Sequence, residues 1–187
     1  MQPKTRLDRA AVIKAAADLA DAEGLEHLTL ARLAEHLGIR SPSLYNHVES
    51  LAGLRRDLAL LALDELDTHL TRAVMGMAGN AAVTSLAHAY RAFAKEHPGL
   101  YAATMHAPDP ADEETKQVAA SVVAVIVTVL AAYGLHGDDA VHAVRVLRSA
   151  MDGFVMLETT GGFGMPLDLD ESYRRLIQIM IRGLQHG

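Results

Sequence analysis

Residues 29–48 read TLARLAEHLGIRSPSLYNHV. Thr29 is a favourable N-cap for a short helix, and Gly38 would end that helix because glycine readily adopts the left-handed backbone of a helix C-terminus. Ser41 would cap the next short helix, with Pro42 at the first helical position, where its missing N–H has no cost. Two short helices joined by such a tight turn must pack at a steep angle. The stretch therefore predicts a helix-turn-helix.

The packing of such a pair requires a small residue on the first helix, a glycine in the turn and an apolar anchor on the second helix. Ala34, Gly38 and Leu44 supply these features. The outer face of the second helix then stays free, and a helix about 10–12 Å across fits the major groove of DNA. An ordinary helix hairpin with a polar face fits the same spacing equally well. The polar residues on this face are Ser41, Ser43, Tyr45, Asn46 and His47, with Arg40 just before them.

Helical periodicity continues through the rest of the chain, so the sequence predicts an all-α fold. A first helix would begin after Asp8 and end at Gly24, and a long helix would run from Leu51 to about Met75. The valine-rich segment 118–130 has strand propensity, but its length and helical neighbours favour a buried helix. We expect a three-helix N-terminal domain over 1–55 and a helical domain over 56–187. Glycine- and proline-rich breaks separate the remaining predicted helices, at about 81–96, 98–106, 112–133, 138–160 and 171–185.

The composition excludes several classes of protein. Half of the residues are hydrophobic, and there is no cysteine, which rules out disulfides, thiolate zinc sites and cysteine nucleophiles. The N-terminus lacks the apolar segment of a signal peptide, and the longest apolar run, residues 118–133, is shorter than the ~20 residues of a membrane span. We therefore expect a soluble, cytoplasmic protein without a membrane partner.

The net charge of −6 is unevenly distributed along the chain. Residues 1–56 contain eight Lys or Arg and seven Asp or Glu, a net charge of +1, whereas residues 57–187 contain nine and sixteen, a net charge of −7. This asymmetry is compatible with a DNA-binding N-terminal part.

Residues 8–63 resemble the DNA-binding domain of the tetracycline-repressor (TetR) family of transcriptional regulators. The resemblance rests on AADLADAEG at 16–24, LTL at 28–30, LAEHLGI at 33–39 and SLYNH at 43–47, in the order and spacing of the family. It implies a homodimer that binds a palindromic DNA operator, acts as a repressor, and is released when a small-molecule effector occupies the C-terminal domain.

The resemblance also implies roles for individual residues. Tyr45 and His47 would bond DNA phosphates, while the first residues of the second helix and Asn46 would lie near bases. The full DNA-binding set expected is Thr29, Arg40, Ser41, Pro42, Ser43, Tyr45, Asn46, His47 and Arg55.

Two positions depart from the family pattern. Val48 stands where an aromatic residue is usual, which alters packing only. Leu51 stands where a lysine is usual near the start of the fourth helix, and Arg55 or Arg56 would replace its phosphate contact.

Residues 84–185 resemble a branch of the family's C-terminal domains that is named for a Trp-His-Gly motif. The supporting stretches are YRAFAKEHPGLY at 90–101 and RSAMDGFVMLE at 148–158. Met151, Asp152 and Gly153 occupy the motif's positions, so two of its three residues differ.

The predicted helices 138–160 and 171–185 each carry enough apolar residues to pack both on their own core and on a partner. We expect a pair from each of two subunits to form a four-helix interface; the alternative is that both stripes form the internal core of a monomer. The residues expected at the interface are Val141, Val144, Arg148, Met151, Val155, Ile177, Met180 and Leu184.

Aromatic residues and methionine provide an adaptable apolar lining for an effector, and a few polar groups would orient it. Each such residue is individually more typical of plain core, so together they mark a region. These residues are Tyr90, Phe93, His97, Tyr101, Met105, Val122, Ile126 and Phe154.

Nothing in the sequence indicates catalysis. The ten histidines lack metal-ligand spacing, and Gly161–Gly164 follows a helix rather than a strand, so it is no phosphate-binding loop. We therefore expect no catalytic residues, no metal and no cofactor. The alternative to a regulator is a helical ligand carrier or partner-binding module without DNA binding.

Overall fold

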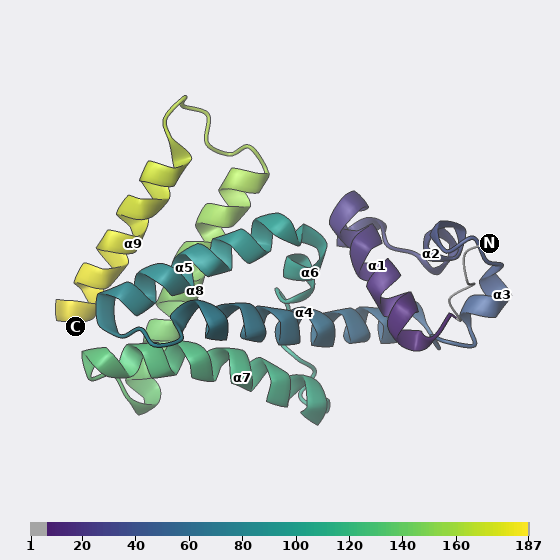
Figure 1. Cartoon of the computed structure of the whole chain (residues 1–187), viewed down its shortest axis with the longest axis horizontal. Helices are drawn as coiled ribbons and strands as arrows, with labels where there is room; N and C mark the ends of the chain where they lie inside the picture. The colour runs from purple at the N-terminus through teal and green to yellow at the C-terminus, as the bar shows by residue number, and fades with distance from the viewer. Residues whose placement is uncertain (1–6, 187) are drawn as a thin grey trace. The chain divides into compact units, whose positions relative to one another are not determined.

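The computed structural model describes residues 7–186, which form α-helices and two short 3₁₀-helices and contain no strand within that range (Figure 1). The predicted all-α fold is therefore confirmed. Lys4 and Arg6, which contribute to the charge of the N-terminal part, lie outside the described residues. The helices are α1 (Arg9–Glu23), η1 (Leu25–His27), α2 (Leu30–His36), α3 (Ser41–Leu44), α4 (Leu51–Val74), α5 (Gly79–Glu96), α6 (Pro98–Ala103), α7 (Glu113–Leu130), η2 (Ala131–Tyr133), α8 (Gly137–Thr159) and α9 (Leu169–His186).

Two of the three predicted N-caps are confirmed. The side chain of Asp8 accepts a hydrogen bond from the backbone N–H of Ala11, and that of Thr29 accepts one from Arg32. The third prediction was wrong by one residue. Ser41 is already the first helical residue of α3, and the extended residue before it is Arg40, which makes no side-chain capping bond.

The later helices begin and end within a few residues of their predicted limits. Helix α6 ends at Ala103 rather than near 106. There the chain continues as a turn, in which the Thr104 hydroxyl donates to the carbonyl of Tyr101. The predicted helix over 112–133 is likewise shorter, because its last residues form the 3₁₀-helix η2.

The chain forms two compact units that are interleaved in sequence. The first consists of residues up to 63 together with 97–116, and the second of 64–96 together with the residues from 117 onward. The sequence had placed a single boundary between 55 and 56. A segment far along the chain thus belongs to the unit that carries α1, α2 and α3, which a linear reading of the sequence does not reveal.

Within the first unit, α1 packs on α6, α2 and η1. Gly99 of α6 lies so close to α1 that a Cβ atom on it would come within 2.2 Å of the Ala20 carbonyl carbon. The carboxylate of Asp21, at the end of α1, accepts hydrogen bonds from the backbone N–H groups of Gly99 (2.8 Å) and Leu100 (3.0 Å). One side chain of α1 therefore satisfies N–H groups that the helix geometry of α6 leaves free.

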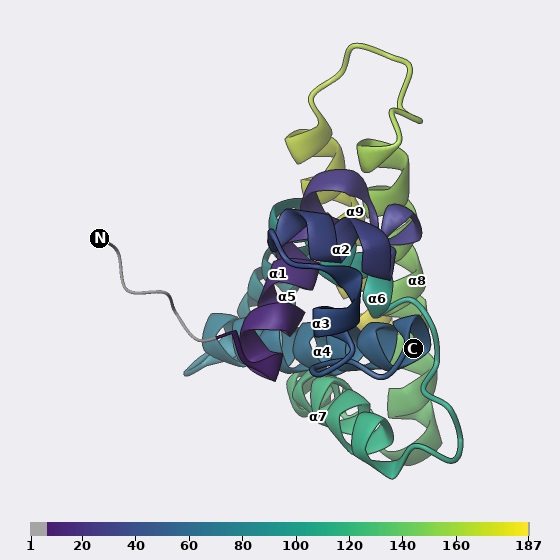
Figure 2. The ribbon, with the colours of Figure 1, turned by 90° about the vertical axis from the view of Figure 1, so that its right-hand side faces the viewer.

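Within the second unit, α5, α8 and α9 pack on one another, and α8 and α9 lie side by side with a loop between them (Figure 2). The buried Arg91 of α5 donates to Glu158 of α8 and to Asp170 of α9. Its guanidinium also lies over the rings of Tyr173 (4.8 Å) and Phe154 (5.5 Å). These contacts satisfy a buried charge that would otherwise be costly.

Helix α7 is a helix as predicted, but only one of its faces is buried. The helical segment 113–133 is long enough to cross a membrane, and its most apolar 18-residue window has a mean hydropathy of 1.8. Only 28% of its most apolar window is buried within the chain. Val122, Ile126 and Val129 form the buried face, whereas Val123 is 38% exposed.

The contact at Gly99 gives a test of the first unit. Gly99→Ala should lower the free energy of unfolding by about 3 kcal/mol, because the new methyl group overlaps the α1 backbone and the two helices must separate. Urea unfolding followed by circular dichroism measures the change.

Gly53→Ala is the matched control for Gly99→Ala, since it makes the same change inside a helix. The nearest atom to a Cβ on Gly53 would be the Ser50 hydroxyl at 3.4 Å. The variant should be as stable as the parent or more stable by about 0.5–1 kcal/mol. Equal effects of the two substitutions would contradict the close approach of α6 to α1.

Candidate nucleic-acid interface

The turn between α2 and α3 depends on Gly38. Its φ of 64° lies in the left-handed region that favours glycine. The backbone N–H of Gly38 donates to Glu35, and that of Ile39 donates to Ala34. These bonds close the end of α2 and direct the chain into α3, which confirms the helix-turn-helix predicted from the sequence.

The residues of α3 and the turn after it divide into a buried and an exposed set. Leu44 and Val48 are buried, as are Leu33 and Ala34 of α2, on which α3 packs. Backbone bonds from His47 and Val48 to the carbonyl of Leu44 extend the helical turn beyond the four residues of α3. The opposite side is exposed and polar, and it carries Ser41, Pro42, Ser43, Tyr45 and Asn46, with His47 half-buried at its edge.

Most cations of the first unit are already paired. Arg9 forms an ion pair with Asp57, Lys14 with Asp18, and Arg32 with both Glu23 and Glu35. Lys116 pairs with Glu113. Among the lysines and arginines described in 7–63 and 97–116, only Arg40 and Arg55 make no side-chain ion pair or hydrogen bond.

Arg40 and Arg55 belong to the predicted DNA-binding set, and both are exposed. Arg56, the other residue considered as a phosphate contact, donates to Asp112 and to Glu114. The pKa of Asp112 lies well below its ordinary range, because its carboxylate accepts hydrogen bonds from Arg56 and from Thr115. Arg55 is therefore the arginine of this pair whose charge is available to an anion.

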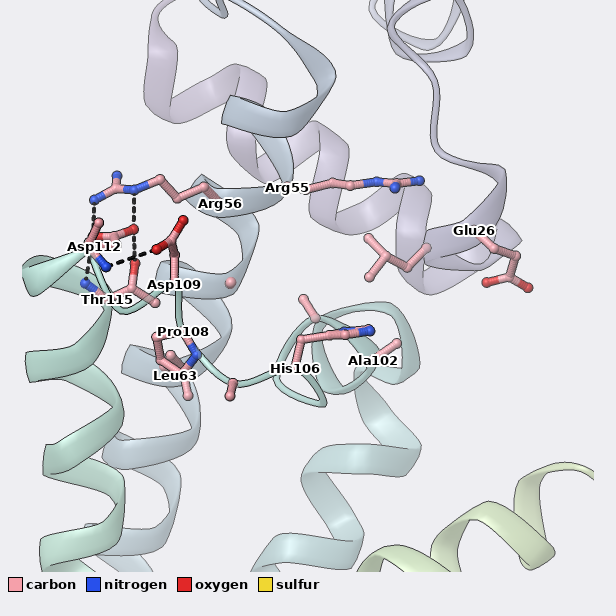
Figure 3. Close-up of a pocket in the computed structure, with 15 residues that line it drawn as sticks. Glu26, Arg55, Arg56, Leu63, Ala102, His106, Pro108, Asp109, Asp112 and Thr115 are labelled. Atoms are coloured by element: carbon pink, nitrogen blue, oxygen red, sulfur yellow. Dashed lines mark hydrogen bonds and ion pairs between the residues drawn. The ribbon is translucent and has the colours of Figure 1, made fainter.

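A solvent-open cavity of about 1070 Å³ lies within the first unit (Figure 3). Its walls come from η1, from α4 between Arg55 and Leu63, from α6, and from the segment that leads into α7. The sequence analysis did not anticipate this cavity, because helices from distant parts of the chain enclose it. Its lining residues are Leu25, Glu26, Arg55, Arg56, Ala59, Leu63, Ala102, Ala103, His106, Ala107, Pro108, Asp109, Ala111, Asp112 and Thr115.

The eight residues predicted to surround an effector are divided between the two units and do not line this cavity. In the first unit, His97 contacts Asp21 at 3.2 Å, and Tyr101 and Met105 are partly exposed. In the second unit, the remaining five are buried, and they are Tyr90, Phe93, Val122, Ile126 and Phe154.

Asp152, at the histidine position of the Trp-His-Gly motif, has a defined role within the second unit. It accepts a hydrogen bond from the hydroxyl of buried Tyr90 (2.5 Å) and one from Arg148 (3.2 Å). An effector that contacted Tyr90 would have to compete with this carboxylate.

The eight residues predicted at a dimer interface also divide by exposure. Val144, Met151, Val155, Ile177 and Met180 are buried inside the chain itself, which leaves them no surface for a partner. Val141 and Arg148 are exposed, and Leu184 is half-buried. The regular apolar stripes thus mark the faces of α8 and α9 that pack inward. Other apolar side chains of the two helices are exposed, namely Val146 (66%), Met156 (58%) and Ile179 (65%).

Comparison with known proteins agrees with this architecture. A family model described as the tetracyclin repressor-like C-terminal domain matches residues 83–180, close to the range 84–185 inferred from the sequence. An uncharacterized HTH-type transcriptional regulator of Mycobacterium tuberculosis, Rv0681, is 36% identical over 96% of this chain and 83% of its own length. The chain belongs to the TetR family of transcriptional regulators.

Two further comparisons agree with this result, one in sequence and one in fold. The HTH-type transcriptional regulator YobS of Bacillus subtilis is 35% identical over 98% of this chain and 96% of its own length. The fold matches the crystal structure of "a possible TetR family transcriptional regulator" from Streptomyces coelicolor A3(2) with a TM-score of 0.72 and 22% identity, over 96% of this chain and 99% of that one. The nearly complete coverage extends the likeness to both units.

The division of α3 into buried and exposed residues predicts opposite effects at adjacent positions. Leu44→Ala should lower the free energy of unfolding by about 3 kcal/mol, since it removes a fully buried anchor and leaves a cavity. Ser43→Ala, its matched neighbour, should change stability by less than about 0.5 kcal/mol. Urea unfolding measures both, and a comparable loss in the two variants would contradict the orientation of α3.

Proposed function

We propose that this TetR-family regulator is a cytoplasmic repressor that binds a palindromic DNA operator as a homodimer and releases it when a small molecule binds. The observation that carries the proposal is the exposed polar side of α3, together with Arg40 and Arg55, the two arginines of the first unit that pair with none of the described residues. Polar side chains on a protruding helix are suited to base edges, and unpaired arginines are suited to phosphates.

In the proposed complex, α3 enters the major groove. Ser41, Pro42, Ser43 and Asn46 lie near bases, while Tyr45 and His47 bond phosphates. Tyr45 is 58% exposed and its side chain makes no bond to the described chain, so its hydroxyl is available. Thr29 is exposed at the start of α2, and although its side chain accepts a bond from Arg32, its hydroxyl can still donate to a phosphate.

The proposed dimer uses α8 and α9, with different residues from those predicted. Both helices pack on α5 and on each other, so their faces turned away from α5 lie on a common side. Val146 and Met156 of α8 and Ile179 of α9 are apolar and largely exposed. Exposed apolar side chains on two neighbouring helices are suited to a four-helix contact with a second copy.

Release of the operator requires an effector that binds the DNA-free form more tightly than the bound form. Helix α4 belongs to both units, since the boundary between them falls after Leu63 in the middle of the helix. A change in α4 would alter the separation of the two α3 helices in a dimer. Because these must lie about 34–36 Å apart to reach successive major grooves, a small displacement would suffice.

The DNA-binding proposal predicts tight, salt-dependent binding to one palindromic segment. The full chain would be titrated with short duplexes from the DNA flanking its own gene, or from a random library if none of these is preferred. Tyr45→Ala should weaken operator binding by about tenfold or more through loss of phosphate bonds. Arg40→Gln should lower the slope of log affinity against log salt by about 2 for a dimer.

Arg72→Gln is the matched control for Arg40→Gln, because Arg72 is an exposed arginine of the second unit. It should leave both operator affinity and the salt slope unchanged. Absence of any preferred sequence, or an Arg40→Gln protein with the parent's salt slope, would refute the proposed interface. Retained folding and dimerisation in Tyr45→Ala separate loss of contact from loss of structure.

The proposed dimer surface has its own test in sedimentation velocity. Ile179→Asp should raise the dimer dissociation constant at least about hundredfold, because it places an unpaired charge in an apolar contact. Val123→Asp makes a similar change on the exposed side of α7 and should leave the dimer intact. A dimer that tolerates Ile179→Asp, or a parent chain that is monomeric at micromolar concentration, would disprove the assignment.

A further inference from the structure

We propose that the cavity of the first unit binds a small carboxylate with an apolar body, and that Arg55 holds the carboxylate group. The cavity is lined by the same helix-turn-helix unit that is proposed to contact DNA. Its volume of about 1070 Å³ is ample for a small organic ligand, since such sites usually measure about 300–1,000 Å³.

The charges of the lining single out Arg55. Its neighbour Arg56 is occupied by Asp112 (2.8 Å) and Glu114 (2.7 Å). Asp112 is in turn saturated by Arg56 and by the hydroxyl and N–H of Thr115. The guanidinium of Arg56 is thus held by two carboxylates and is not available to a ligand. Arg55 makes no hydrogen bond or ion pair with any described residue, so its guanidinium is the positive charge of the lining that is available to a ligand.

The other acids of the lining compete only weakly for Arg55. One carboxylate oxygen of Asp109 accepts the backbone N–H of Ala111 (2.8 Å), which holds that side chain in its own turn. Glu26 is 73% exposed, so water screens its charge. Figure 3 shows the Arg55 side chain extending toward the side of the cavity where Glu26 lies.

The rest of the lining suits an apolar body. Leu25, Ala59, Leu63, Ala102 and Pro108 provide hydrocarbon surface on several sides. His106 also lines the cavity and makes no hydrogen bond within the described chain, so its ring can add a second polar contact. A planar guanidinium binds a carboxylate through two parallel N–H bonds, which fixes the orientation of the ligand as well as its charge.

The proposed carboxylate site and the proposed DNA interface share one side chain, that of Arg55. Arg55 is also the arginine available for a phosphate of the operator, and a guanidinium held by a ligand carboxylate cannot keep the same bonds to DNA. Ligand and operator would therefore compete for Arg55. This regulatory consequence rests on the proposed function, whereas binding of the carboxylate does not.

Isothermal titration calorimetry of the full chain without DNA tests the site with three probes of equal chain length, octanoate, octan-1-ol and octylammonium. Octanoate should bind once per chain and at least about tenfold more tightly than the alcohol or the amine. Arg55→Gln should remove that preference by weakening octanoate about tenfold or more while leaving octan-1-ol unchanged. Arg72→Gln, the matched exposed arginine of the second unit, should bind octanoate like the parent.

Three outcomes would overturn the proposal: octylammonium binding as tightly as octanoate, octanoate binding unaffected by Arg55→Gln, or no octanoate binding at millimolar concentration. Operator binding is measured separately on the same protein. A chain that binds its operator but not octanoate disproves the carboxylate site alone. A chain that binds octanoate through Arg55 but prefers no DNA sequence disproves the proposed function and leaves the site intact.

Discussion

The carboxylate of Asp21, at the end of α1, accepts two N–H groups at the start of α6, and the missing side chain at Gly99 lets the two helices approach along their backbones. This contact joins residues almost eighty positions apart and makes α6 part of the helix-turn-helix unit. The cavity exists because of it, since α6 supplies one wall while α4 and η1 supply others. A helix-turn-helix of so few residues has only a small hydrophobic core. Helix α6 enlarges the compact unit to which the helix-turn-helix belongs.

The sequence was sufficient to predict the helices because their signals are local. Asp8 and Thr29 cap as expected, Gly38 makes the turn, and apolar spacing located every later helix to within a few residues. The shift of the third N-cap from Ser41 to Arg40 is of the same local kind. It changes no buried contact and leaves the exposed side of α3 as predicted.

Other features depend on tertiary contacts and could not be predicted in this way. The spacing of apolar residues shows that one face of a helix is buried, but it does not show whether that face packs on the same chain or on a partner subunit. Val144 and Ile177 were therefore assigned to a partner, although they are buried within their own chain. For the same reason, the sequence did not predict the cavity or the division of the expected effector residues between two units. Nor does spacing show which cations are paired: Arg32 and Arg55 look alike in the sequence, yet only Arg32 is held by two carboxylates.

The interleaving of the two units has a consequence for how such a regulator can be rearranged. The chain passes between the units inside α4, at the junction of α5 with α6, and inside α7. A contiguous fragment ending after Leu63 would carry every residue proposed to contact DNA but would leave Asp21 without the N–H groups of α6. Exchange of DNA-binding modules between such proteins, in evolution or in the laboratory, would have to transfer residues 97–116 as well. The residues proposed to contact DNA and helix α6 would therefore have to be transferred together.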